Sequence, residues 1–166
     1  MKEIELKFRV DGFSPIRKKL RSLGGKLLWK GREENWLFDT PDFKIRKGNQ
    51  MLRIKTMGDT SLTLKIGKKV VQGAKVAEEH QIMITDAKIG RIILEKLGYR
   101  VTLHYKKHRE HWRIGTSFVE LDTLGDGRKF VEIESTHKGI KKLARKLNLD
   151  FTRNTPESYT KLLLKG

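Results

Sequence analysis

The sequence EIELKF, residues 3–8, alternates charged and apolar side chains at every second position. A period of two is typical of a β-strand, because successive side chains point to opposite faces. We therefore expect a strand over residues 2–10, with Glu3, Glu5 and Lys7 on one face and the apolar residues between them on the other. This opening strand raises the question of whether its charged face meets water or a binding site.

The same alternation recurs along the chain. The polar residues that share a face within their own segments are Arg53 and Lys55, Thr63 and Lys65, Lys75, Glu79 and Gln81, Lys107, Arg109 and His111, Glu120 and Asp122, and Glu132 and Glu134. For one strand alone, exposure to solvent explains a charged face. Repeated over about eight strands, the pattern favours a curved sheet whose charged faces point inward together.

Helix signals lie between these strands. Helices are predicted over residues 14–25, 86–98, 136–149 and 155–164, with Ser14, Asp86 and Thr155 as caps and glycines as stops for the first two. Hairpin turns are predicted at residues 58–59 and 125–127. Hairpin connections favour an antiparallel α+β fold. We expect one domain over residues 1–166, an eight-stranded closed or nearly closed β-barrel with about four helices packed outside.

The composition indicates the kind of partner. The 37 Lys and Arg residues exceed the 20 Asp and Glu residues and give a formal net charge of +17. This excess favours anionic partners such as nucleic acid or phosphorylated small molecules. The absence of cysteine excludes disulfides and thiolate sites. The sequence shows no apolar signal region and no run of transmembrane length, so we expect a cytoplasmic protein without membrane association; it gives no indication of oligomeric state.

Carboxylates and cations that face one another would suit a particular ligand. Buried charges persist when they are paired or hold an ion. Carboxylate oxygens are hard ligands that suit Mg²⁺ or Mn²⁺, while Lys and Arg suit phosphate oxygens. A chamber with both sets therefore matches a metal-bound polyphosphate. The chain has no Gly-rich GxxxxGK segment, which disfavours P-loop chemistry.

Several segments, in this order, resemble the CYTH superfamily, or triphosphate tunnel metalloenzymes, which includes class IV adenylyl cyclase and thiamine triphosphatase. They are EIELK at residue 3, WLFDTPDF at 36, MLRIK at 51, LTLK at 62, YKKHRE at 105, ELDTLGDGRKFVEIE at 120 and SYTKLLL at 158. The resemblance runs from Glu3 to about Leu164. It implies an eight-stranded antiparallel tunnel.

The resemblance also implies roles for individual residues. Metal ions, Mg²⁺ or Mn²⁺, would be held by Glu3, Glu5, Glu132 and Glu134, and phosphates by Lys7, Arg53, Lys55, Lys65, Lys107 and Arg109. The catalytic set would comprise Glu3, Glu5, Lys7, Asp122 and Glu132, with Glu79 as a further tunnel-lining residue. The sequence departs from the family pattern at Gln81, where a second carboxylate is common, and at Ala77, where a basic residue is common.

The function implied by the resemblance is metal-dependent cleavage of a triphosphate. We expect class IV adenylyl cyclase-like activity, which converts ATP to cyclic AMP and pyrophosphate. The alternatives are hydrolysis of thiamine triphosphate, inorganic triphosphate or another organic triphosphate. They stay open because cyclisation and hydrolysis require the same binding of the phosphates. A different alternative is a non-catalytic basic barrel that binds RNA or polyphosphate, with the outward basic residues of the helix at 136–149 as a secondary nucleic-acid contact: Lys141, Lys142, Arg145 and Lys146.

Overall fold

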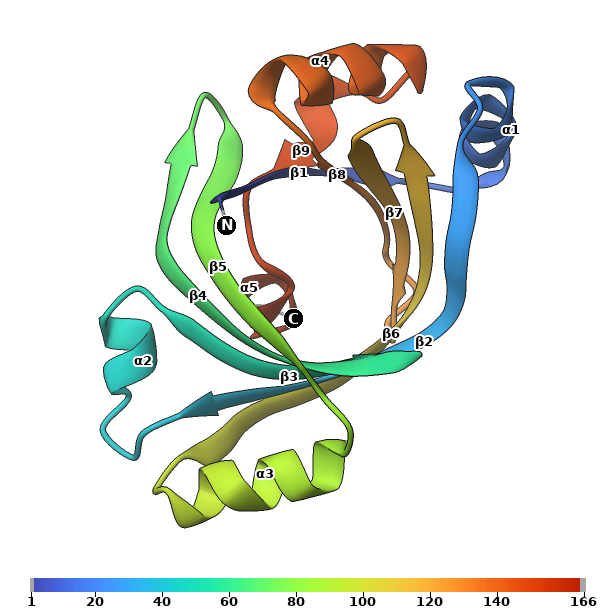
Figure 1. Cartoon of the computed structure of the whole chain (residues 1–166). Coiled ribbons are helices and arrows are strands. Elements are labelled where there is room, and N and C mark those ends of the chain that lie inside the picture. The colour runs from blue at the N-terminus through green and yellow to red at the C-terminus, as the bar shows by residue number, and fades with distance from the viewer. Residues whose placement is uncertain (1, 165–166) are drawn as a thin grey trace. The chain divides into compact units, whose positions relative to one another are not determined.

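Strands follow the predicted alternation in the computed structural model, which describes residues 2–164. The elements in chain order are β1 (Lys2–Val10), α1 (Ser14–Ser22), β2 (Lys26–Asp39), α2 (Lys44–Lys47), β3 (Met51–Met57), β4 (Asp59–Val71), β5 (Ala74–Ile84), α3 (Ala87–Lys96), β6 (Arg100–Ile114), β7 (Ser117–Leu124), β8 (Lys129–Glu134), α4 (His137–Lys146), a 3₁₀ turn (Phe151–Arg153), β9 (Asn154–Thr155) and α5 (Tyr159–Leu164) (Figure 1).

The strands are hydrogen-bonded in the order β5-β4-β3-β2-β6-β7-β8-β1-β9, and β5 also pairs with β1. The pairing of the eight longer strands is therefore cyclic, which is the topology of a closed antiparallel β-barrel, and the short β9 is added to β1. The predicted α+β fold class is confirmed. The hairpin turns are confirmed too, because β3 and β4 flank Gly58, while residues 125–127 join β7 to β8.

The chain forms two compact units. Unit 1 comprises Arg32–Lys69 and Ala77–Lys106 together with Lys2, and unit 2 comprises Glu3–Gly31, Val70–Val76 and the chain from Lys107 onward. Because β2, β4, β5 and β6 are long strands, each contributes residues to both units. That residues 1–166 form one domain stays a prediction.

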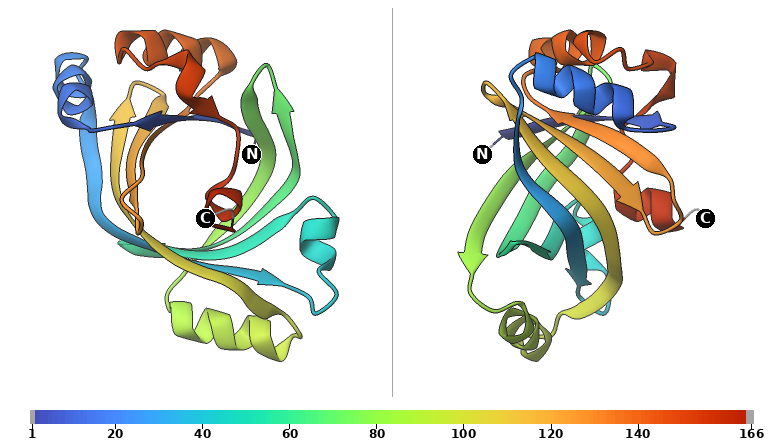
Figure 2. Two further views of the ribbon diagram at one scale, coloured as in Figure 1. Left: turned by 180° about the vertical axis from the view of Figure 1, so that it is seen from behind. Right: turned by 90° about the vertical axis from the view of Figure 1, so that its right-hand side faces the viewer.

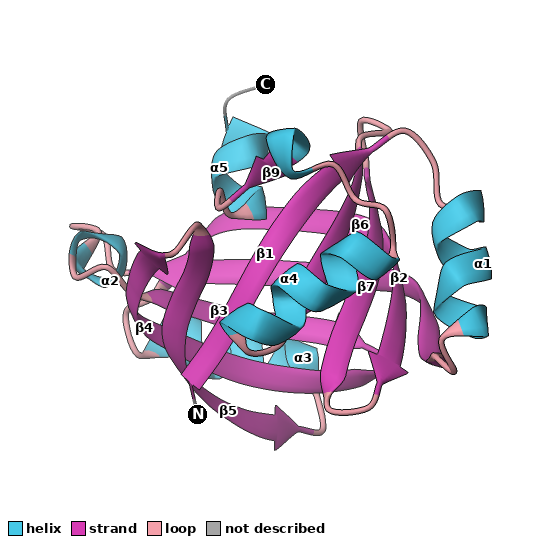
Figure 3. Ribbon diagram, turned by 90° about the horizontal axis from the view of Figure 1, so that it is seen from above, coloured by secondary structure: helices cyan, strands magenta, loops and turns pink. Residues whose placement is uncertain are grey.

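The core of unit 2 lies between its strands and the helices α1 and α4. Phe8 of β1, Val119 of β7 and Ile133 of β8 are completely buried there, and Leu20 of α1 and Ile140 of α4 pack into the same cluster. The two helices lie over one face of these strands, as two views of the ribbon show (Figure 2, Figure 3). The outward placement predicted for the four basic residues of the helix at 136–149 is confirmed, because all four are exposed while Ile140, Leu143 and Ala144 are buried.

The core of unit 1 lies between α3 and the strands beneath it. Phe38 of β2, Ile54 of β3 and Leu94 of α3 form its buried centre. Gly90 of α3 permits the close approach, because a Cβ atom at this position would lie 2.7 Å from the Cδ1 atom of Ile84 and 3.2 Å from that of Ile54. The side chain of Asp86 caps α3 as predicted, accepting a hydrogen bond at 3.0 Å from the backbone amide of Ile89.

The predicted caps of two other helices are wrong. Phe13, not Ser14, occupies the N-cap of α1, with no capping hydrogen bond from a side chain. The reason is that Phe13 is buried in the core, which starts the helix one residue earlier than the polar signal indicates. Thr155 does not cap the last helix, because it pairs with Lys7 as part of β9. The helix begins later, and the hydroxyl of Ser158 accepts from a first-turn amide at 3.3 Å.

Three short elements among the described residues had no prediction: α2, the 3₁₀ turn and β9. Phe43 precedes α2 with a positive φ of 61°, a conformation that sequence patterns rarely signal for an aromatic residue. The carboxylate of Asp39 accepts hydrogen bonds from the backbone amides of Ile45 and Arg46 and fixes this turn. Within residues 2–164, the helices are all too short or too polar to cross a membrane.

Candidate active site

Charged residues of β1, β6, β7 and β8 meet in unit 2 because strand register aligns their polar faces. Lys7 of β1 lies opposite Glu132 of β8, which lies opposite Glu120 of β7. Next to this row, Asp122 of β7 lies opposite Arg109 of β6. Since side chains alternate between faces, these charged groups share one side of the sheet. Together with Lys107 of β6 they are named the unit 2 cluster: Lys7, Lys107, Arg109, Glu120, Asp122 and Glu132.

Arg109 connects the carboxylates of this cluster. Its Nε donates to Asp122 Oδ1 at 2.7 Å, and its Nη2 donates to Asp122 Oδ2 at 2.6 Å and to Glu132 Oε2 at 3.0 Å. Its Nη1 forms an ion pair with Glu120. Lys107 Nζ donates to Asp122 Oδ2 at 3.0 Å, and Lys7 Nζ donates to Glu132 Oε1 at 2.7 Å. Each carboxylate is therefore paired, as buried charges require.

Tyr159 of α5 lies against the cluster. Its hydroxyl donates a hydrogen bond to Asp122, and its ring packs edge-to-face against Phe130. The Nζ atoms of Lys7 and Lys107 lie 4.3 Å and 4.1 Å from the centre of the ring. The ring thus offers both ammonium groups a cation–π contact in a buried setting.

The protonation states in the cluster follow from burial and charge. Burial of Glu132 raises the pKa of its carboxyl, but Lys7 and Arg109 lower it more, so the net pKa lies well below the usual value. Burial of Lys7 lowers its pKa, but Glu132 and Glu5 reverse this effect and the net pKa is raised. Burial together with the Asp122 charge raises the pKa of Tyr159 well above its usual range. Glu132 and Lys7 consequently keep their charges, and Tyr159 its proton, at neutral pH.

The other glutamates of the predicted metal set lie along the same face of β1 and β8. Glu5 is buried, lies directly opposite Glu134, and forms an ion pair with Lys75 of β5. Glu3 is partly buried, two residues before Glu5 on β1. The structure therefore places Glu3, Glu5, Glu132 and Glu134 on adjacent strands. Their role as metal ligands stays a prediction.

Three carboxylates of the unit 2 cluster lie close enough to hold one metal ion. One oxygen each from Glu120, Asp122 and Glu132 can be chosen so that all three lie within 4.8 Å of one another. Hard carboxylate oxygens at such spacing fit the donor preference of Mg²⁺ or Mn²⁺. Glu120 was not among the predicted ligands, although the sequence places it on the same face of its strand as Asp122.

A second polar cluster lies in unit 1, on β2, β3, β4 and β5. It consists of Asn35, Arg53, Lys55, Lys65 and Glu79 and is named the unit 1 cluster. Asn35 lies opposite Lys55, and Arg53 Nη1 donates to Asn35 Oδ1 at 3.4 Å. Lys65, which is buried, forms an ion pair with Glu79 at 2.9 Å. The three cations accompany Glu79 and the buried Glu33, which accepts a hydrogen bond at 2.8 Å from Asn35 Nδ2. The cations are thus in excess, which suits an anionic ligand.

The carboxylate of Glu79 in the unit 1 cluster is held ionised. Burial raises the pKa of Glu79, but Lys65 and Arg53 lower it more, so that the net pKa is lowered. The two departures from the family pattern lie on the same strand, β5. Gln81 accepts a hydrogen bond at 3.2 Å from the hydroxyl of Thr63, and Ala77 is buried. The partner of Gln81 is thus a neutral hydroxyl group, for which an amide oxygen is a sufficient acceptor and a carboxylate is not needed.

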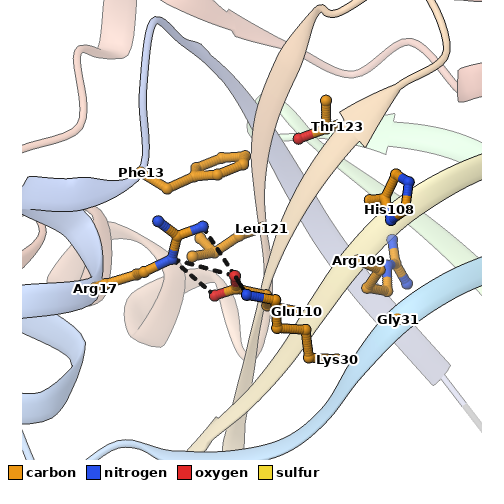
Figure 4. A pocket seen from close by; sticks show the side chains of 9 residues that line it. All are labelled: Phe13, Arg17, Lys30, Gly31, His108, Arg109, Glu110, Leu121 and Thr123. Atoms are coloured by element: carbon orange, nitrogen blue, oxygen red, sulfur yellow. Dashed lines mark hydrogen bonds and ion pairs between the residues drawn. The ribbon is translucent and has the colours of Figure 1, made fainter.

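A further charged group lies on the opposite face of β6. Glu110 accepts hydrogen bonds from Arg17 Nη2 at 2.8 Å and from Trp112 Nε1 at 3.3 Å, and Lys30 lies 3.2 Å from it (Figure 4). A cavity of about 200 Å³ borders this group, and Phe13 contributes an aromatic wall. Burial raises the pKa of Glu110, but Arg17 and Lys30 lower it more. Because the cations converge on Glu110, this group fastens α1 to β6.

The structure therefore brings most predicted site residues together in two groups. Lys7, Lys107, Arg109, Asp122 and Glu132 contact one another directly in unit 2. Arg53, Lys55, Lys65 and Glu79 lie together in unit 1. Sequence reasoning missed Tyr159 and Lys75, which reach the site from distant segments; Tyr159 lies within the quoted segment SYTKLLL but had no assigned role.

The match to a protein family agrees with this geometry. The family model described as CYTH domain matches residues 1–159. The chain belongs to the CYTH domain family. The resemblance drawn from the order of the charged strands is thus confirmed, and the charged clusters lie within the matched part of this CYTH domain.

Two curated relatives of this CYTH domain have names that refer to adenylate cyclase. A protein of Methanocaldococcus jannaschii, provisionally named an adenylate cyclase, is 28% identical over 143 residues, which cover 84% of this chain and 80% of that protein. Adenylate cyclase CyaB of Aeromonas hydrophila is 28% identical over 132 residues, which cover 79% of this chain and 67% of that protein.

Solved structures share the fold. A structure from Vibrio parahaemolyticus has a TM-score of 0.85 at 20% identity and covers 98% of this CYTH domain and 97% of that chain. The protein HpAC1 from Hippeastrum, described as having a dominant triphosphatase activity, has a TM-score of 0.71 at 18% identity over 99% of this chain and 96% of that one. Identities this low establish the fold alone.

Proposed function

We propose that this CYTH domain is a metal-dependent enzyme that acts on a triphosphate-bearing substrate. The observation that carries the proposal is the unit 2 cluster, in which the carboxylates of β7 and β8 are flanked by the cations of β1 and β6. Such a cluster costs free energy to bury, which argues for a functional reason to retain it. Membership of the family supports the same class of substrate.

The metal would be held by Glu120, Asp122 and Glu132, whose oxygens lie close enough together to bind one ion. Glu3 and Glu5 of β1 and Glu134 of β8 are the further proposed ligands. When bound, Mg²⁺ or Mn²⁺ would neutralise phosphate charge. The low pKa of Glu132 suits a ligand rather than a base, because a carboxyl that stays ionised accepts a proton poorly.

The phosphates would be bound by Lys7, Lys107 and Arg109 in unit 2, with the three cations of the unit 1 cluster as a second phosphate-binding group. The three carboxylates of the unit 2 cluster are balanced by its three cations. A balanced cluster attracts a polyanion weakly until a divalent ion adds positive charge. We therefore expect phosphate binding to depend on metal. The raised pKa of Lys7 keeps its charge available to the developing oxyanion.

We propose adenylyl cyclase-like chemistry as the reaction, supported by the names of both curated relatives. The ribose 3′-oxygen of ATP would form a bond to the α-phosphorus while the bond to the β-phosphate oxygen breaks. Cyclic AMP and pyrophosphate result, and the hydroxyl proton passes to solvent or to a carboxylate of the cluster. Lys107 and Arg109 would stabilise the charge that develops on the leaving pyrophosphate.

Hydrolysis of a triphosphate is the second candidate. The composition of the unit 2 cluster favours it, because all six members of the cluster are Lys, Arg, Asp or Glu. Tyr159 contacts the cluster at Asp122, and His111 contacts it at Glu120. Charged groups recognise metal and phosphate in any triphosphate, whereas adenine requires neutral donors, acceptors or stacking surfaces.

A substrate panel tests both candidates. ATP, thiamine triphosphate and inorganic triphosphate are supplied separately with Mg²⁺ or Mn²⁺, and every product is identified by chromatography. Cyclic AMP from ATP supports cyclisation, and phosphate release supports hydrolysis. Full turnover in the presence of chelator would contradict the metal dependence. Absence of turnover combined with tight RNA binding that weakens steeply with salt would favour the non-catalytic basic barrel.

A further inference from the structure

Three arginines line a cavity of about 370 Å³ in unit 2 that the proposed reaction does not use. Arg9 of β1, Arg128 near the start of β8 and Arg153 of the 3₁₀ turn provide its charge, and Phe130 and Asn154 also line it. Guanidinium groups that border one cavity are suited to oxyanions, because each presents several N–H donors in a plane.

The cavity continues the pattern of the unit 2 cluster along the same strands. Arg9 lies two residues beyond Lys7 on β1 and therefore on the same face, about 6.5–7 Å further along the strand. Arg9 is paired with Phe130 of β8, and Phe130 is paired with Asp122 of β7. Phe130 also packs against the ring of Tyr159. The cavity thus borders the cluster within one unit.

The arginines retain donors for a ligand. Arg153 forms a two-pronged pair with Asp11 at 2.7 Å and 2.8 Å. Arg128 pairs with Asp126 through Nε at 2.7 Å and Nη2 at 2.6 Å, and its Nη2 also donates to the carbonyl oxygen of Leu162 at 2.9 Å. A guanidinium group has five N–H donors, so neither pairing uses all of them. Arg9 is exposed and forms no ion pair within residues 2–164, although its charge contributes to the low pKa of Asp11.

We propose that this cavity binds a phosphate group next to those held by the unit 2 cluster. The inference rests on the proposed function and extends it to phosphate chains longer than a triphosphate. A linear chain anchored at Lys7 would reach Arg9 with a few further phosphate units. The same chemistry would also hold a separate phosphate or pyrophosphate ion beside a bound triphosphate.

The test is calorimetric titration of the full chain with inorganic triphosphate and with a longer linear polyphosphate of defined length, in Mg²⁺ and again in chelator. The titration yields a Kd where the ligand is not cleaved, and a KM with kcat where it is. The variants are Arg9→Gln and the matched control Arg145→Gln, which removes an exposed arginine of α4. Circular dichroism confirms that both variants are folded.

We expect the longer chain to bind more tightly than triphosphate to the wild-type protein. Arg9→Gln should reduce this preference by about ten- to a hundredfold, the effect of losing a hydrogen bond to a charged group. Arg145→Gln should leave the preference unchanged. In a second arm, inorganic phosphate is titrated into protein saturated with triphosphate. Binding there that depends on Arg9, without a preference for the longer chain, would identify a separate ion as the ligand.

Two results would overturn the inference. One is equal affinity for both chain lengths together with no binding of added phosphate. The other is an equal effect of Arg9→Gln and Arg145→Gln, which would indicate general electrostatic attraction. The proposed function fails separately, by absence of turnover of the triphosphates in Mg²⁺ or Mn²⁺, whether or not Arg9 confers a preference for longer chains.

Discussion

Removal of Arg109 should destabilise the fold and at the same time strengthen metal binding. Its guanidinium group is 7% exposed and contacts Glu120, Asp122 and Glu132. Loss of one partner from a buried ion pair costs about 3–5 kcal/mol of folding free energy. In Arg109→Gln, Lys7 remains paired with Glu132 and Lys107 with Asp122. The loss of folding free energy should therefore stay within this range.

The effect of metal follows from the same contacts. In the wild-type protein a divalent ion must compete with the guanidinium group for the carboxylate oxygens, whereas in Arg109→Gln it does not. If the ion binds the variant tenfold more tightly, saturating Mg²⁺ should raise its free energy of unfolding by about 1.4 kcal/mol more than it raises that of the wild type. Urea unfolding followed by circular dichroism, in chelator and in Mg²⁺, measures both quantities.

Arg145→Gln is the matched control, because this arginine is exposed on α4 and its loss should change stability by less than about 0.5 kcal/mol. A loss below about 1 kcal/mol in Arg109→Gln would refute the reasoning about burial. Equal stabilisation of wild type and variant by Mg²⁺ would refute the assignment of the three carboxylates as the metal site.

Four other predictions concern single groups. Glu132→Gln should lower turnover of triphosphate on the order of a hundredfold, the cost of losing one preorganised electrostatic contact, as steady-state kinetics would show. Arg53→Ala should weaken triphosphate binding by roughly 2–5 kcal/mol, whereas exposed Lys141→Ala should leave it unchanged; equal losses in titration would contradict a defined site. Because the pKa of Glu132 is depressed in the fold, its stabilising contribution is present above about pH 4.5 and is lost as pH falls through the lower folded value. The stability difference between wild type and Glu132→Gln should therefore shrink in acid, and a constant difference would contradict this. Tyr159→Phe removes a donor to Asp122 and should lower the free energy of unfolding by about 1–3 kcal/mol; an unchanged urea midpoint would show that the hydrogen bond contributes nothing.

The faces of the strands were predictable because they depend on local geometry alone. In any extended backbone, successive side chains point to opposite faces. The alternation of Glu3, Glu5 and Lys7 with apolar residues therefore tells which residues share a face of the strand. Asp86 was predictable as a cap for the same reason, since its side chain binds an amide three residues away. Ser14 failed because a long-range effect, burial of Phe13, decides where that helix starts.

The composition of the clusters was less predictable, since it depends on which strands become neighbours. Glu120 lies in phase with Asp122, yet its proximity to Glu132 follows from the pairing of β7 with β8. Tyr159 has no periodic signal and reaches Asp122 from 37 positions away. Lys75 meets Glu5 across 70 positions. Such contacts are set by tertiary register, which one sequence without a known fold does not specify.

The pairing of β1 with β8 has a consequence for how the protein is made. Lys7 and Glu132 are 125 positions apart, so this contact cannot form until most of the chain has left the ribosome. Contacts between residues so distant in sequence slow folding, because a large loop must close first. During that interval the β8-facing edge of β1 lacks its final partner, and unpaired edges recruit other chains. If two nascent β1 strands on one polysome paired in parallel and in register, Glu3, Glu5 and Lys7 would each lie opposite their own copy, and like charges in that position are destabilising. The residues proposed for catalysis would in this way also keep the growing chain from aggregating.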